Sequence, residues 1–253
     1  MTIDTPKLCQ EPMLKKLWQE TFGDTDDFVD AFWKTAYAQD RCRCVTVEEK
    51  PVSVIYWLDC SYAGHKVAYL YAGATDKAFR GRGYFSCLLT DVHCRLKARG
   101  YEGIVLVPGE ESLRSFYARH GYVSCGSIRE FICGAAGAPA QLRRIQAEEY
   151  GQLRRSLLPA GSVLQEGQNL DFLNTQATLF AGNNFLLAAR QEGDILIGLE
   201  LLGEEQTAPG ILQALGFLKG RFRCPGAGRA FAVYLALTEN TEELPTYFGL
   251  AFD

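Results

Sequence analysis

The chain has 253 residues, of which 47% are hydrophobic and 22% are charged, and its formal net charge is −4. This composition is typical of a globular protein with a sizeable core, arranged as one large domain or two ordinary ones. The negative balance argues against a nucleic-acid-binding protein, because such domains are usually basic. No apolar run is long enough to cross a bilayer, and the first residues lack the apolar segment of a secretory signal.

The nine cysteines stand singly in apolar or strand-like segments, where a cysteine acts as a small hydrophobic side chain. Cys42 and Cys44 form a C-x-C pair, but no second pair lies at the spacing of a zinc site. We therefore expect reduced thiols, a cytoplasmic location and no bound metal.

The first third of the chain predicts two helices followed by three strands. Apolar residues recur at helical spacing, with Pro12 near the start of the first helix and Thr25 as the cap of the second. Runs rich in β-branched and aromatic residues then follow with short polar joints, which is typical of an antiparallel meander. The predicted helices cover residues 11–23 and 25–38, and the predicted strands cover 43–49, 51–62 and 66–75.

A second helix-and-strand pattern follows. Phe85, Leu88, Leu89, Val92 and Leu96 form one apolar stripe, which predicts a helix that faces a core and ends at Gly100. We then expect a buried strand, a short helix and a last pair of strands, over residues 101–109, 110–121 and 122–133. Because a helix joins the strand that ends near residue 75 to the strand at 101–109, these two strands should run parallel.

Residues 133–141, "CGAAGAPAQ", are small and uncharged and are predicted to join two domains, at 1–135 and 141–253. The second half resembles the first in its order of elements, so the predicted fold class is α/β, with two similar halves built on mixed sheets. Its predicted helices cover 142–158, 171–180 and 208–220; its predicted strands cover a hairpin at 184–202 and the segments 229–237 and 246–253.

The candidate chemistry begins at Arg80-Gly81-Arg82-Gly83, a basic turn directly before an apolar helix that has no polar cap. Free backbone N–H groups at a helix start, with arginines beside them, are suited to bind phosphate. Together with Tyr84 and Phe85, this turn resembles the R/Q-x-x-G-x-G/A motif of the GNAT acyltransferases. Phe85 departs from the motif, which usually has a second small residue there.

A second match lies further along the chain. "FYARHGY", which contains Tyr117 and Tyr122, resembles the Y-x-x-x-G-F helix of the same family. With a second GNAT-like half, the chain is most similar to the tandem-GNAT subgroup that includes aminoglycoside acetyltransferases of the enhanced-intracellular-survival type. The resemblance implies acetyl-CoA as cosubstrate, bound without a metal by the turn and the preceding strand end. These residues are Gly73, Ala74, Thr75, Arg80, Gly81, Arg82, Gly83, Tyr84, Phe85 and Ser86.

The resemblance further implies transfer of the acetyl group to a primary amine by direct attack in a ternary complex. Tyr117 would be the catalytic acid, since a phenol keeps its proton at neutral pH. We expect the acceptor to be a small molecule or a peptide amine. The sequence leaves open whether the chain forms a homo-oligomer. The alternative is a coenzyme-binding or ligand-sensing protein without turnover, suggested by Phe85 and by the lack of a legible general base.

The general base is left open at this stage. Glu110 and Glu111 precede the Tyr117 helix, where they also act as favourable first-turn charges, and His65 and His120 have no catalytic partner in the sequence. The second half should lack its own coenzyme site, because "GEEQTAPGI" carries two acids and Pro209 where the first half has arginines. "CPGAGRA" at 224–230 leads into a strand and is interpreted as a turn.

Overall fold

The computed structural model describes residues 1–239 and 243–252, and these divide into two units. The first unit contains residues 1–106 with 235–239, and the second contains 107–234 with 243–252. This division falls earlier than residues 135–141. The reason is that a single long strand, β6 (Val123–Gly134), runs through this part of the chain and pairs with strands of the second unit.

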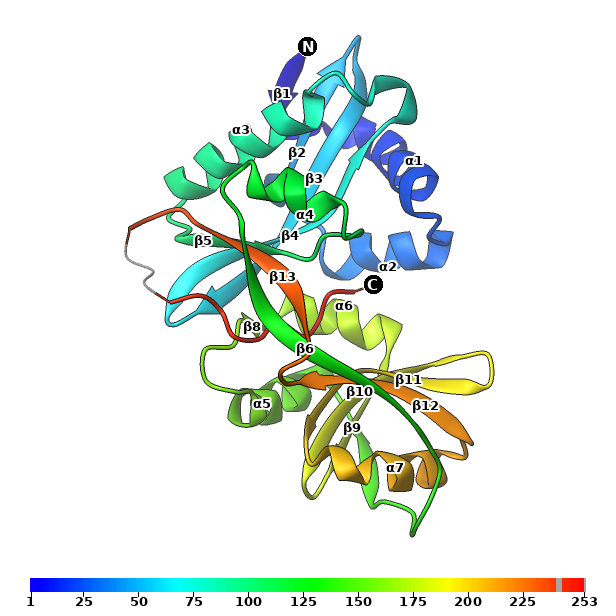
Figure 1. The fold of residues 1–253 in the computed structure, drawn as a ribbon. Coiled ribbons are helices and arrows are strands. Elements are labelled where there is room, and N and C mark those ends of the chain that lie inside the picture. The colour runs from blue at the N-terminus through cyan, green and yellow to red at the C-terminus, as the bar shows by residue number, and fades with distance from the viewer. Residues whose placement is uncertain (240–242, 253) are drawn as a thin grey trace. The chain divides into compact units, whose positions relative to one another are not determined.

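The first unit is built on a sheet of order β1-β2-β3-β4-β5, in which only the β4–β5 pair is parallel. The parallel pair confirms the expected crossover through a helix. Helices α1 and α2 lie on one side of this sheet and α3 lies on the other (Figure 1). The strands are β1 (Thr2–Asp4), β2 (Cys42–Val47), β3 (Lys50–Tyr62), β4 (His65–Thr75) and β5 (Gly103–Leu106); the helices are α1 (Glu11–Phe22), α2 (Asp26–Thr35) and α3 (Tyr84–Ala98).

Local signals explain where these helices begin and end. The Thr25 hydroxyl accepts a hydrogen bond from the Phe28 N–H at 3.3 Å and caps α2, as expected. Gly23 ends α1 with a φ of 77°, a left-handed conformation that glycine adopts without strain. On α3 the predicted stripe is confirmed, since Leu88, Leu89 and Val92 are fully buried against the sheet.

The second unit has a sheet of order β13-β6-β12-β11-β10-β9-β7. Its β11–α7–β12 segment is a parallel crossover, the same arrangement as β4–α3–β5 in the first unit. The strands are β6, β7 (Leu142–Ile145), β8 (Leu164–Gln165), β9 (Thr178–Gly182), β10 (Phe185–Glu192), β11 (Ile195–Gly203), β12 (Lys219–Pro225) and β13 (Arg229–Ala236); the helices are α4 (Leu113–Ala118), α5 (Ala147–Leu157), α6 (Gln168–Gln176) and α7 (Ala208–Leu215).

Several predicted boundaries differ from the structure. The helix expected over 142–158 begins with strand β7, and the one expected over 171–180 divides into the end of α6 and β9. The strand expected over 246–253 is absent from the described residues of that segment, where Tyr247 forms only an isolated bridge with Ser162; residue 253 lies outside them. In the first two cases the short strands β7 and β9 pair with each other across about 30 to 40 residues, and a local pattern does not contain such a pairing.

The second unit contains one fully buried charge network. Arg154 on α5 binds both carboxylate oxygens of Glu200 on β11, at 2.7 and 3.0 Å. The hydroxyls of Tyr150 and Tyr247 donate to the same carboxylate at 2.9 and 3.0 Å. Four hydrogen bonds from three partners offset the cost of burying this charge, so the network fixes α5 and the C-terminal segment on the sheet.

Candidate active site

The start of α3 is the feature on which the candidate site depends. The N-cap residue is Gly83, with a φ of 78°, and no side chain caps the helix. The first N–H groups of an α-helix have no partner inside the helix, so the amides of Tyr84 and Ser86 are available. The turn of residues 80–83 is exposed. A helix of 15 residues adds its dipole to these amides, which together suit a phosphate group.

Three polar contacts hold the turn before α3 in place. Asp76 accepts a hydrogen bond from the Ala78 N–H at 2.9 Å and pairs with Lys50 at 2.6 Å. The Lys50 hydrogen bond, followed by that of Ala78, lowers the pKa of Asp76 below its ordinary value. Arg80 donates from Nε to the Thr75 carbonyl at 3.0 Å. The turn is thus tied to the end of β4 while its outer side stays open.

The two predicted arginines keep exposed side chains in this turn. The guanidinium of Arg82 lies 5.2 Å from the centre of the Phe79 ring, and Arg80 makes the backbone contact already described. Gly81 has a φ of 74°, and neither Gly81 nor Gly83 has an atom within 4 Å of the place where a Cβ would stand. The space over the turn is therefore open in this unit, and two positive charges border it.

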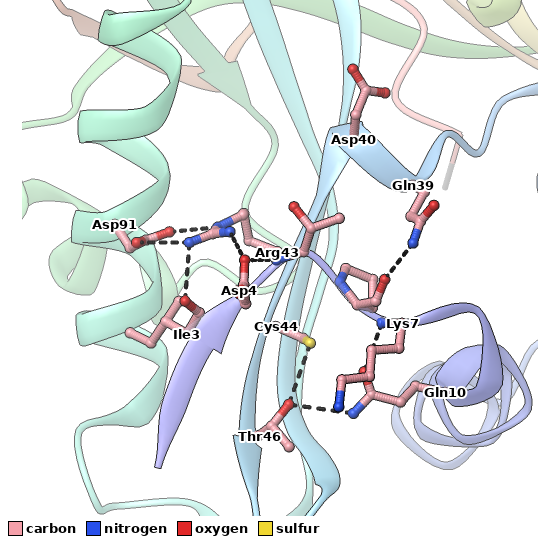
Figure 2. Close-up of polar contacts among 12 residues, drawn as sticks. Ile3, Asp4, Lys7, Gln10, Gln39, Asp40, Arg43, Cys44, Thr46 and Asp91 are labelled. Atoms are coloured by element: carbon pink, nitrogen blue, oxygen red, sulfur yellow. Dashed lines mark hydrogen bonds and ion pairs between the residues drawn. The ribbon is translucent and has the colours of Figure 1, made fainter.

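Arg43 ties α3 to the sheet, and Figure 2 shows it between the helix and β1. Its Nε and Nη2 donate to the carboxylate of Asp91 on α3, at 2.8 and 3.1 Å. Its remaining contacts go to the Asp4 carboxylate at 2.9 Å and the Ile3 carbonyl at 3.1 Å. These bonds, that of Asp91 first, raise the pKa of Arg43 above its ordinary value. Since Arg43 lies only 8% exposed, this pairing sets the position of α3 on the sheet.

The end of β4 carries a β-bulge beside the turn. Tyr71 pairs with Tyr56 and Ala74 pairs with Val54, so Ala72 and Gly73 together oppose Ile55. Ala72 takes a φ of 47°, in the left-handed region. In the described residues, β4 pairs with β5 only from Val67 to Tyr69. The bulged part of β4 therefore has an edge that β5 does not cover, where backbone groups can meet an extended ligand.

Phe85, which departs from the family motif, packs onto this bulge. A Cβ placed on Gly73 would lie 2.9 Å from Cζ of the Phe85 ring. Glycine at 73 is therefore explained by a close contact with a neighbouring ring. The ring lies against Gly73 of β4, and no atom of it comes within 4 Å of the place where a Cβ on Gly83 would stand.

The other strand-end residues are held in place by Ser53. Its hydroxyl donates to the Ala74 carbonyl at 3.1 Å and shares a hydrogen bond with the Thr75 hydroxyl at 2.8 Å. Ala74 is buried and Thr75 is half-buried, whereas Gly73 is exposed. Of the three predicted strand residues, Gly73 is thus the one whose backbone reaches the surface.

Tyr117 lies on α4, in the second unit. Its ring packs edge-on against Tyr122, with 5.5 Å between the ring centres. Burial raises the pKa of Tyr117 to about 12. Its hydroxyl makes no hydrogen bond with any residue that the structure describes. A phenol in this environment stays protonated at neutral pH and has its proton free to donate.

The candidate bases have ordinary structural roles. Glu111 pairs with Arg114 at 2.8 Å, and Glu110 accepts a hydrogen bond from the Ser112 hydroxyl at 3.1 Å. His65 contacts Glu102 at 2.9 Å, while Nδ1 of His120 lies 3.0 Å from the Phe116 carbonyl oxygen. These contacts single out none of the four as a general base.

The equivalent crossover in the second unit has a different helix start. Pro209 stands in the first turn of α7, where it removes one amide. A Cβ on Gly210 would lie 2.8 Å from the Ala138 carbonyl oxygen, so residues 138–140 pack directly on this turn. Glu205, just before the helix, pairs with Arg129. The start of α7 is therefore covered by residues 138–140 and has the acidic Glu205 before it. The start of α3 is uncovered and has Arg80 and Arg82 before it.

Comparison with known proteins identifies the first half. Residues 4–125 match the family model described as an acetyltransferase (GNAT) domain. The first half of the chain is a GNAT acetyltransferase domain. No curated protein matches the sequence. Within the described residues, no group of three or more His, Cys, Asp or Glu side chains could hold a metal ion. The helices of the same residues include none with the length and apolar composition of a membrane span.

Solved structures extend the likeness beyond the GNAT domain. A probable N-acyltransferase from Enterococcus faecalis has a TM-score of 0.74 and 14% identity, covering 93% of this chain and 72% of that one. A GCN5-related N-acetyltransferase from Kribbella flavida has a TM-score of 0.70 at 14% identity, with the same coverage. Eis1 from Mycobacterium abscessus has a TM-score of 0.68 at 11% identity, covering 94% and 74%. The fold of both halves is therefore that of a tandem GNAT protein.

Replacing Arg43 by Met should lower the free energy of unfolding by about 2 kcal/mol, because Asp91 loses its charged partner beside the sheet. Urea denaturation with an unchanged m-value would measure this loss. Lys16→Met removes an exposed charge from the same unit, whose pair with Glu20 spans 3.7 Å, and should change stability by less than about 0.5 kcal/mol. Equal effects of the two substitutions would contradict the anchoring role of Arg43.

Proposed function

We propose that the protein transfers an acetyl group from acetyl-CoA to a primary amine. The observation that carries this proposal is the uncapped start of α3. There, backbone amides without a helical partner and two arginine side chains border the free space over Gly81 and Gly83. The pyrophosphate of the coenzyme would accept hydrogen bonds from the amides of Tyr84 and Ser86 at the start of α3. Arg80 and Arg82 would add charge at the same place.

The chain of acetyl-CoA that carries the thioester (the arm) would run along the open edge of β4. In this arrangement the backbone of Gly73 pairs with the amides of the arm, as an added strand would, while Ala74 and Thr75 hold the strand end in shape. The bulge at Ala72 and Gly73 supports this role, because it frees backbone groups from the β3 ladder.

In the proposed reaction the amine attacks the carbonyl carbon of the thioester directly. A C–N bond forms and the C–S bond breaks, so that the sulfur leaves with the electron pair. Tyr117 would donate its proton to that sulfur, and the amine would lose its own proton to solvent or to a base that the residues do not single out. The pKa of about 12 supports an acid role, since the hydroxyl is protonated throughout the neutral range.

Aromatic rings of α2 and the sheet support a positively charged amine as the acceptor. Trp33 stacks on Tyr37 with 4.8 Å between ring centres, and both are half-buried beside Tyr56. The indole N–H of Trp33 and the hydroxyls of Tyr37 and Tyr56 have no hydrogen-bond partner among the described residues. Ring faces attract ammonium groups, and unpaired polar atoms favour a polar ligand beside them.

Coenzyme binding should depend on Gly83. Gly83→Leu forces a left-handed backbone onto a branched side chain and fills the space over the turn, so acetyl-CoA affinity measured by calorimetry should fall at least about 100-fold. Gly64→Leu is the matched control, because Gly64 has a φ of 81° and open space but lies in the β3–β4 hairpin. The control should bind as the unmodified protein does. The assignment is wrong if both variants bind alike.

Turnover should depend on the Tyr117 hydroxyl. Tyr117→Phe keeps the ring and should lower kcat by about 10²- to 10⁴-fold with little change in coenzyme affinity. Release of free thiol from acetyl-CoA, measured against a panel of amines, provides the readout. In the unmodified enzyme, ionisation of Tyr117 should not lower kcat below about pH 11. If no amine releases thiol although the coenzyme binds, the protein senses the coenzyme without turning it over.

A further inference from the structure

A basic hollow lies in the second unit, on the side of the sheet opposite α7. Phe222 and Gly220 of β12 point toward α7, where Phe222 is fully buried against Ile211 and Leu212. Side chains alternate along a strand, so Arg221 and Arg223 point to the other side. There they line a hollow of about 270 Å³ together with residues of β6, β10 and β11, namely Glu130, Arg190, Glu192, Ile197, Gly198 and Leu199.

The hollow has an excess of positive charge in a chain that is acidic as a whole. Three guanidinium groups and two carboxylates line it. Arg190 pairs with Glu192 at 2.6 Å, and Arg223 pairs with Glu130 at 3.4 Å. Glu130 also accepts a hydrogen bond from Arg229, which lies beside the hollow, at 3.1 Å. Two carboxylates thus pair with three arginines, and the fourth, Arg221, has neither of them as a partner.

Arg221 is the arginine left over. Its side chain is exposed and has no ion pair or hydrogen bond with any residue that the structure describes. Its neighbours across the sheet are Ile197 and Ile132, and no carboxylate stands opposite it. An exposed strand arginine between two isoleucines has its five donors free for a ligand.

The hollow is lined in part by buried apolar side chains and by an arginine that packs against an aromatic ring. Ile197 and Leu199 are 4% and 8% exposed and form its apolar part. The guanidinium of Arg223 lies 4.6 Å from the centre of the Phe231 ring, which holds it in place. Apolar surface under fixed guanidinium groups strengthens their attraction for an anion, because less water screens the charges.

We propose that this hollow binds the carboxylate or phosphate group of a small molecule. Arg221 would contact the oxyanion in a forked geometry, and Arg190 and Arg223 would supply the surrounding charge. Ile197 and Leu199 would contact a short apolar stem next to the charged group. The site lies entirely in the second unit, and it does not depend on the proposed acetyl transfer.

The test is a titration followed by NMR of the arginine Nε–Hε groups, with inorganic phosphate and with succinate as separate probes at constant ionic strength. Saturable shifts of the Arg221 and Arg223 signals are expected with at least one probe, and the stronger probe tells a phosphate site from a carboxylate site. Arg221→Gln should weaken binding at least about tenfold.

Two further variants make the result specific. Glu192→Gln releases Arg190 from its carboxylate partner and should tighten binding, a gain that a damaged fold cannot produce. Arg144→Gln removes another exposed strand arginine of the same unit and should leave binding unchanged. The proposal is overturned if the shifts do not saturate with either probe, or if Arg221→Gln binds as tightly as the unmodified protein.

Discussion

Helix α3 begins on a glycine in a left-handed conformation, and no side chain of its own caps its first amides. Most helices satisfy these groups with a serine, threonine or aspartate, as α2 does with Thr25. An uncapped start leaves polar groups that need a partner, and an anion from outside the chain is the partner that the dipole favours. The rest of the first unit can be understood as holding this helix start in the right place.

Two contacts do most of this holding. Arg43 binds Asp91 on the middle of α3, and so fixes the helix along the sheet. Phe85 packs its ring onto Gly73, and so fixes the first turn of the helix against the bulge of β4. The helix start and the open strand edge therefore form one rigid frame, in which a phosphate site and an extended backbone site have a set spacing.

The sequence was sufficient for the parts that depend on local pattern. The apolar stripe of α3, the cap of α2 and the parallel crossover from β4 to β5 follow from residue spacing and are confirmed. The family likeness rests on a turn and a helix whose residues are close together in the chain. The tandem arrangement was also visible, because the second half repeats the same order of elements.

Features that depend on distant residues were not visible in the sequence. Arg43 and Asp91 are 48 positions apart, and the only signal was a charged residue inside an apolar strand. The β4 bulge can be recognised only from the pairing register of β4 with β3. The reason for a glycine at position 73 can be recognised only from the position of the Phe85 ring. The alternation "KGRFRC" on β12 did contain the arginines of the basic hollow, but which side of the sheet they lie on depends on where α7 packs.

We expect one coenzyme site per chain, at the start of α3, because the corresponding start of α7 is covered by residues 138–140 and carries Pro209. The number of acetyl-CoA molecules bound per chain, measured by calorimetric titration of the intact protein, tests this claim most directly. We predict that binding saturates at one acetyl-CoA per chain. Saturation at two, or binding of acetyl-CoA by residues 141–253 expressed alone, would contradict it.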